Sequence, residues 1–140
     1  MRPPPRTAAE LTLAPITNLD YVVLLCDRLA ETRVFYLETM RFALETDRPA
    51  WVSFRVGSTL LTLRPRGTGP GDDDGPGAAG SASVQLAFRV PPPAIDDWHA
   101  ELIARNVPIV GPPRELAAWR HRALFFRDPE GNSIELYAEV

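Results

Sequence analysis

The expected secondary-structure elements occur in the same order twice along the chain, and this repeat restricts the possible folds more than any other feature. The spacing of apolar residues predicts a strand, a helix and three strands in each half. The first set comprises strands at 19–25, 42–45, 51–56 and 59–64 and a helix at 27–40. The second set comprises strands at 83–90, 108–110, 121–126 and 132–137 and a helix at 94–105. The repeat predicts two similar modules of mixed α and β structure.

The segment between the halves has a different composition. Residues 65–82 contain six glycines and the triplet Asp72-Asp73-Asp74, but no large apolar residue. This composition is typical of a linker, and the triplet is interpreted as a solvated loop because no partner ligands lie near it in the sequence. We therefore divide the chain into modules at 16–64 and 83–140, preceded by a tail at 1–15 that is disordered or exchanged with a partner chain.

Composition excludes several classes of protein. A chain of 140 residues forms one domain, or two small halves that share a core. The net charge of −3 and the pI near 5.4 argue against a nucleic-acid partner, because binding to phosphate requires basic patches. No apolar run is long enough to predict a membrane span. The single cysteine, Cys26, cannot form an internal disulfide, which favours a cytoplasmic location.

The C-terminal residues predict a strand, a tight turn and a second strand. Asp128-Pro129-Glu130-Gly131-Asn132 has the composition of a turn, since proline fixes one φ angle and glycine accepts a positive one. In the strand that follows, Glu135 alternates with Ile134 and Leu136. The sequence therefore places one carboxylate in the middle of a strand, on the face opposite its apolar neighbours. Earlier in the chain, Asp27 occupies the position expected for the N-cap of the first helix.

Several motifs carry a resemblance to a known family. They are the run from Phe126 to Asn132, the strand sequence Leu86-Ala87-Phe88-Arg89-Val90 and the pair Phe35-Tyr36. With the doubled element order, these motifs resemble the vicinal oxygen chelate superfamily, which contains glyoxalases, extradiol dioxygenases and bleomycin-resistance proteins. The resemblance covers roughly residues 17–139. It implies an α+β fold in which two βαβββ modules form a curled mixed sheet, or cup, with the helices outside.

The resemblance also implies where a metal would bind. In such families four residues, typically His, Glu, His and Glu, hold a divalent ion in the cup, and here these positions fall on Tyr21, Thr62, Gln85 and Glu135. Only Glu135 keeps its ligand type. Neutral hydroxyl and amide oxygens are poor ligands for zinc, iron or nickel. We therefore predict a metal-free member of the superfamily with no cofactor.

Strand alternation, phased on those four positions, gives an apolar face under the helices and a mixed face toward the cup. Aromatic and polar side chains on the mixed face suit a small aromatic or amphipathic organic ligand. The predicted ligand-binding residues are Trp51, Arg55, Thr62, Gln85, Arg89, Phe125 and Tyr137. Structural alternatives remain for some of them: Trp51 could cap the sheet edge, and Arg55 and Arg89 could neutralise Glu135 as buried ion pairs.

Two functions are compatible with these residues. The first is binding of a drug or natural product by a homodimer, as in proteins similar to the bleomycin-resistance type. The second is a metal-independent isomerase, cyclase or lyase. In that enzyme Glu135 would act as the general base, and Tyr21 or His121 would donate the proton. Whether the chain is an enzyme, and whether His121 faces the cup, are left open by the sequence.

Overall fold

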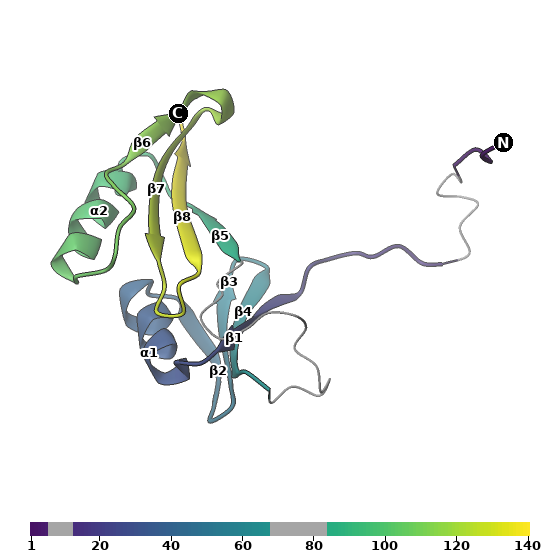
Figure 1. The fold of residues 1–140 in the computed structure, drawn as a ribbon, viewed down its shortest axis with the longest axis horizontal. Helices are drawn as coiled ribbons and strands as arrows, with labels where there is room; N and C mark the ends of the chain where they lie inside the picture. Colours follow the sequence, from purple (N-terminus) through teal and green to yellow (C-terminus); the bar gives the residue numbers. More distant parts are fainter. Residues whose placement is uncertain (6–12, 68–83) are drawn as a thin grey trace.

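The structure is a computed structural model that describes residues 1–5, 13–67 and 84–140. In the first module a strand and a helix are followed by three strands, as predicted. A helical segment of π type continues α1 directly (Figure 1). The elements are β1 (Tyr21–Cys26), α1 (Leu29–Val34), η2 (Phe35–Thr39), β2 (Ala43–Arg48), β3 (Trp51–Val56) and β4 (Thr59–Pro65).

The second module has the same order of elements. A short 3₁₀ turn, η3, lies between the second and third of its strands. The elements are β5 (Gln85–Arg89), α2 (Ala94–Ala104), β6 (Arg114–Leu116), η3 (Ala117–Trp119), β7 (His121–Arg127) and β8 (Ser133–Glu139). Most of the predicted linker, and residues 6–12 of the tail, lie outside the described residues.

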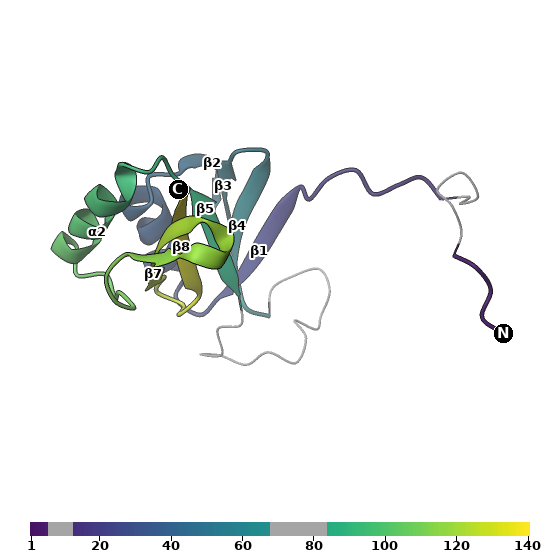
Figure 2. The same cartoon turned by 90° about the horizontal axis from the view of Figure 1, so that it is seen from above.

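Each module forms its own four-stranded mixed sheet. The strand orders are β1-β4-β3-β2 and β5-β8-β7-β6, with one parallel pair in each sheet, β1 with β4 and β5 with β8. The α+β fold of two βαβββ modules is thus confirmed, and its sheets leave the cup open. Seen from two directions, both helices lie on one side of the strands (Figures 1 and 2). No helix among the described residues covers the opposite sheet faces.

The predicted sixth strand is displaced along the chain. Pro108–Val110 was expected to form it, but here only an isolated bridge joins Ile109 to Phe126, and the strand is Arg114–Leu116. Both segments pair with β7, and the chain between them is interrupted at Gly111, whose φ is +107°. Pro112 and Pro113 follow and cannot donate a ladder hydrogen bond, so this edge strand is broken into two parts.

The helix-covered faces of the two sheets share one core. In β8 the buried residues Ile134, Leu136 and Ala138 alternate with half-buried Ser133, Glu135 and Tyr137. The predicted apolar face is therefore confirmed for this strand. The other strands contribute buried side chains from the same face, among them Leu24, Val52, Phe54, Leu61, Leu63, Leu124 and Phe126. Hydrophobic burial in this shared core holds the two modules together.

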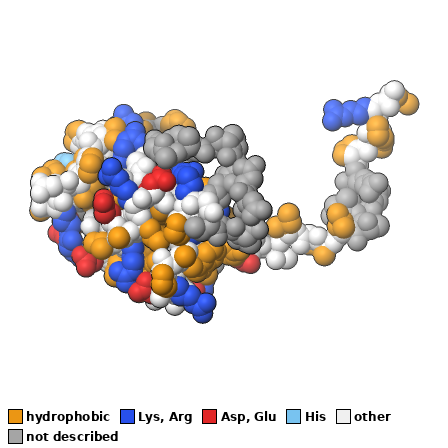
Figure 3. Space-filling view, turned by 60° about the horizontal axis from the view of Figure 1, so that its bottom comes forward, with side chains coloured by type: hydrophobic (Ala, Val, Ile, Leu, Met, Phe, Trp, Pro, Cys, Tyr) orange, Lys and Arg blue, Asp and Glu red, His pale blue; other side chains and the backbone are white. Residues whose placement is uncertain are grey.

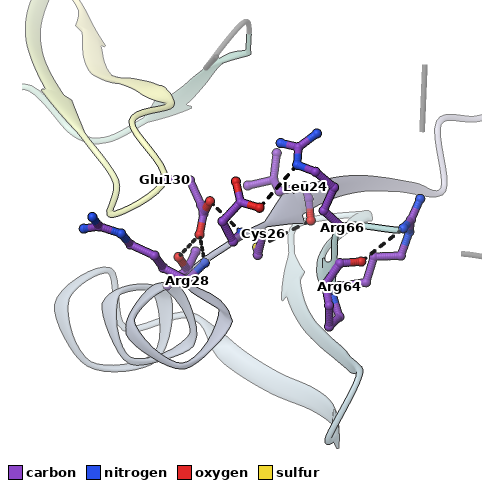
Figure 4. Close-up of polar contacts among 9 residues, drawn as sticks. Leu24, Cys26, Arg28, Arg64, Arg66 and Glu130 are labelled. Carbon is purple, nitrogen blue, oxygen red and sulfur yellow. Dashed lines mark hydrogen bonds and ion pairs between the residues drawn. The ribbon is translucent and has the colours of Figure 1, made fainter. Parts of the chain in front are cut away.

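The β7–β8 turn also joins the modules through the start of α1. The Glu130 carboxylate accepts hydrogen bonds from the backbone N–H groups of Asp27 (2.9 Å) and Arg28 (2.6 Å) and from the Thr32 hydroxyl (3.2 Å), as Figure 4 shows in part. The prediction that Asp27 caps the helix is wrong. Arg28 is the N-cap residue and makes no side-chain capping bond. Instead, a carboxylate 103 positions from Asp27 binds the helix N-terminus.

An extended arm precedes β1. Its residues 13–20 reach away from the body of the protein and carry hydrophobic side chains (Figure 3). Leu13, Ile16 and Leu19 are all largely exposed there. No helix within the described residues is long and apolar enough to cross a membrane.

Candidate functional site

The mixed face of the second sheet contains an open hollow of about 480 Å³. The strand ladder explains its composition, because residues that alternate with the buried core residues share this face. Its described lining residues are Gln85, Ala87, Leu116, Trp119, His121, Phe125, Glu135 and Tyr137. Five of these were predicted as site residues, and His121 is shown to face the same space as Glu135.

Glu135 lies in the middle of this hollow. In the ladder it stands between Ala87 on β5 and Phe125 on β7, so its nearest cross-strand neighbours are apolar. One carboxylate oxygen, Oε1, accepts a hydrogen bond from Gln85 Nε2 over 3.2 Å. Within the described part of the chain, no arginine forms an ion pair with Glu135. The half-buried carboxylate can therefore accept further hydrogen bonds or pair with a cation from outside.

Aromatic rings form the rest of the wall. The His121 imidazole stacks on the Tyr137 ring with 4.3 Å between the ring centroids and an angle of 23° between the planes. Phe125 lies directly opposite Glu135 on β7, four residues from His121. The backbones of His121 and Glu135 are therefore separated by about 13 Å along the strand direction. Direct proton exchange between the two side chains would require them to bridge that distance.

The two predicted arginines have partners other than Glu135. Arg89 forms an ion pair with Glu139 at 2.9 Å, and its Nε donates to the Tyr137 hydroxyl over 3.4 Å. Arg55 donates to both carboxylate oxygens of Glu45, at 2.8 and 3.1 Å. The alternative in which these arginines neutralise Glu135 as buried pairs is not realised in this structure.

The predicted site residues of the first module form a separate group. The hydroxyl groups of Ser53 and Thr62 hydrogen-bond over 2.9 Å, and both side chains are buried, Thr62 completely. Tyr21 lies on β1 and Trp51 on β3, the two strands that flank β4. Their rings meet edge to face, with 6.3 Å between the ring centroids. In this conformation Thr62 is closed to a ligand, whereas Tyr21 is 52% exposed.

These residues do not fit a divalent transition metal. Tyr21 and Thr62 are on the first sheet, Gln85 and Glu135 are on the second, and Glu135 alone among them offers a carboxyl group as ligand. No group of three or more His, Cys, Asp or Glu side chains that could hold a metal occurs among the described residues. The arrangement instead presents aromatic surface and one carboxylate to a small molecule.

Three lining residues were not among the predicted site residues: Ala87, Leu116 and Trp119. Strand alternation places Ala87 on the mixed face with Gln85, whereas the position of Leu116 could not be foreseen because β6 was expected at Pro108–Val110. Trp119 lies in the 3₁₀ turn before β7 and is 68% exposed. The signal available in the sequence was a tryptophan in the loop before a strand of the mixed face, where it could act as a lid or as packing.

Solved structures of similar fold cover nearly the whole chain. A lactoylglutathione lyase from Agrobacterium tumefaciens is 21% identical, with a TM-score of 0.72 over 89% of this chain and 96% of that one. A virulence protein from Salmonella typhimurium is 26% identical, with a TM-score of 0.72 over 91% and 100%. TioX from Micromonospora sp. ML1 is 19% identical, with a TM-score of 0.70 over 89% and 100%. At these identities the likeness concerns the fold.

A search of curated proteins by sequence returned no significant match. By contrast, the sequence model of one superfamily matches residues 18–136, which is most of the chain and includes both modules and the β7–β8 turn. With the doubled βαβββ order and the two mixed sheets, this match shows that the chain belongs to the Glyoxalase/Bleomycin resistance protein/Dioxygenase superfamily.

Proposed function

We propose that this protein binds a small aromatic or amphipathic organic molecule on the mixed faces of its sheets, without a metal ion. The hollow around Glu135 is the observation that carries the proposal. Its volume of about 480 Å³ and its aromatic walls suit a ligand with a flat ring system. Gln85 and Glu135 would orient the polar end of that ligand.

A homodimer would complete such a site. Both mixed faces are open on one side in the single chain, and Tyr21, Gln85 and Arg89 are exposed on them. A second copy would cover these faces and would bring the Tyr21–Trp51 pair of one chain toward a hollow of the other. The exposed apolar side chains of the N-terminal arm, at Leu13, Ile16 and Leu19, offer a further surface for such a partner.

The binding proposal is tested by titration of the purified protein with a library of aromatic natural products, in the presence of a chelator. Binding is followed by tryptophan fluorescence, with Trp98→Phe used to remove the signal of the indole on α2. We expect saturable quenching that Trp119→Phe diminishes and chelator leaves unchanged. Quenching that disappears with chelator would contradict metal-free binding.

An enzymatic function is the second candidate, because His121 lines the same hollow as Glu135. The separation of the two backbones weakens this candidate, and Tyr21 lies on the other sheet. The two candidates are distinguished by measuring turnover and affinity of Glu135→Gln and of the wild type with any ligand that the titration identifies. Loss of turnover with unchanged affinity would establish a metal-independent isomerase, cyclase or lyase. Loss of affinity, with no turnover in either protein, would establish a binding protein.

A further inference from the structure

The charge pattern of the Glu135 hollow points to the class of ligand that it takes. Among its described lining residues, Glu135 is the only acidic or arginine side chain. Its neighbours in the ladder are Ala87 and Phe125, which provide neither counter-charge nor hydrogen bonds. A carboxylate beside apolar groups interacts with an approaching charge more strongly than one in open water.

The rings of this sheet face already accept cations. The Arg89 guanidinium carbon lies 5.7 Å from the centroid of the Tyr137 ring, and that of Arg114 lies 5.3 Å from the centroid of the Phe125 ring. Cations are drawn to aromatic faces by the ring quadrupole, and tryptophan attracts them most strongly. Trp119 is the tryptophan at the hollow and is 68% exposed, so an indole surface is available to a ligand.

Trp119 is held beside the hollow by its backbone. The 3₁₀ turn that carries it ends at Arg120, whose φ of +54° reverses the chain into β7. The Arg120 carbonyl accepts a hydrogen bond of 2.9 Å from the backbone N–H of Val140, the last residue in the sequence. The C-terminal strand thus fixes both Glu135, through its ladder, and the turn that carries Trp119.

From this arrangement we infer that the ligand is a planar aromatic cation, with its ring against Trp119 and its positive charge near Glu135. The inference rests on the proposed binding function and specifies the charge of the ligand. The opposite possibility, an anion, has two candidate partners, Arg89 beside Tyr137 and Arg114 beside Phe125. Neither arginine lines the hollow, and Arg89 is already paired with Glu139.

Three tricyclic probes of similar shape separate these possibilities: proflavine, which is a cation at neutral pH, acridone, which is neutral, and acridine-9-carboxylate. Fluorescence titration of the full chain should give a dissociation constant for proflavine at least about tenfold below those of the other two. Glu135→Gln should weaken proflavine binding about tenfold and leave acridone binding within about twofold. Glu115→Gln removes the same charge from β6 outside the hollow and should change neither constant.

The outcomes separate the inference from the function on which it rests. If acridone or the carboxylate binds as tightly as proflavine, the protein is a binder but the assignment of a cation is overturned. If none of the three binds to protein that is folded by circular dichroism, the proposed function and the inference both fail. Tight proflavine binding that survives Glu135→Gln also overturns the inference. Loss of the preference for proflavine in Glu135→Gln, with Glu115→Gln unchanged, supports it.

Discussion

Tyr36 donates its phenolic hydrogen to Asp128 over 2.7 Å, and this buried bond joins the helical segment of the first module to the β7–β8 turn of the second. The same carboxylate accepts hydrogen bonds from the backbone N–H of Asn132 (2.9 Å) and from its side-chain amide (3.0 Å). Burial, and the neighbouring Asp128, raise the pKa of Tyr36 well above its usual value. Tyr36 therefore remains a donor, and the turn sequence acts as a buried connection between the modules.

Removal of this donor should destabilise the protein. Tyr36→Phe keeps the ring and leaves one oxygen of the buried Asp128 carboxylate with one donor fewer, so we expect the free energy of unfolding to fall by about 1–3 kcal/mol. Urea denaturation followed by circular dichroism measures it. Tyr21→Phe removes an exposed hydroxyl and should change stability by less than about 0.5 kcal/mol. Equal effects of the two substitutions would show that the buried bond contributes nothing specific.

Glu130 should stabilise α1 from the other module. Glu130→Ala removes the acceptor of two backbone N–H groups and of the Thr32 hydroxyl, and we expect a loss of about 1–2 kcal/mol in the free energy of unfolding. Glu31→Ala is the matched control. It removes a carboxylate from the first turn of the same helix, where its contact with Arg28 spans 3.9 Å between exposed side chains. A similar loss in the control would mean that general charge at the helix N-terminus, rather than these bonds, is responsible.

Alkaline pH should destabilise the fold through Cys26. The side chain is 3% exposed, and its burial, followed by the nearby Glu130, Asp128 and Asp27 carboxylates, raises its pKa from 9.0 to about 12. Because the pKa of Cys26 is higher in the folded than in the unfolded protein, the buried neutral thiol contributes its full stability below pH 9.0. That contribution is lost as the pH rises toward 12, because the unfolded chain releases the thiol proton first. The chain contains no lysine, so no ammonium side chain loses its charge over this range.

Two measurements test the alkaline prediction. The free energy of unfolding of the wild type should decline with pH across this range, and Cys26→Ala should decline less steeply. Iodoacetamide should leave the folded thiol unmodified at pH 9.0 and should alkylate it rapidly in urea. Rapid alkylation of the folded protein would show that Cys26 is accessible as a thiolate, contrary to its burial.

Metal removal should leave the protein unchanged. Since Tyr21, Thr62 and Gln85 are poor ligands, we expect dialysis against a chelator to alter neither the melting temperature nor ligand binding. Elemental analysis of protein purified without chelator measures the metal directly. One equivalent of zinc, iron or nickel per chain, removed with a fall in melting temperature, would contradict the assignment of a metal-free site.

Much of the fold follows from local sequence patterns. The alternation of Ile134 and Leu136 with Glu135 and Tyr137 predicted both faces of β8, because successive side chains in a strand point to opposite sides. The same periodicity gave the correct bounds of β3. Local patterns did not predict the position of β6, because that position depends on pairing with β7. Pro108–Val110 looks as much like a strand as Arg114–Leu116 does, and only the register with β7 decides between them.

The candidate site divides in the same way. The sequence alone determined which residues share a face with Glu135, since that depends only on counting along strands. Tertiary structure decided which of them meet in one hollow: His121, Phe125, Tyr137 and Gln85 line the hollow with Glu135, whereas Thr62 is fully buried on the other sheet and bonded to Ser53. It also decided that Glu130, rather than Asp27, binds the start of α1. Contacts between residues about a hundred positions apart arise from packing of the two modules, which leaves no periodic signal in the sequence.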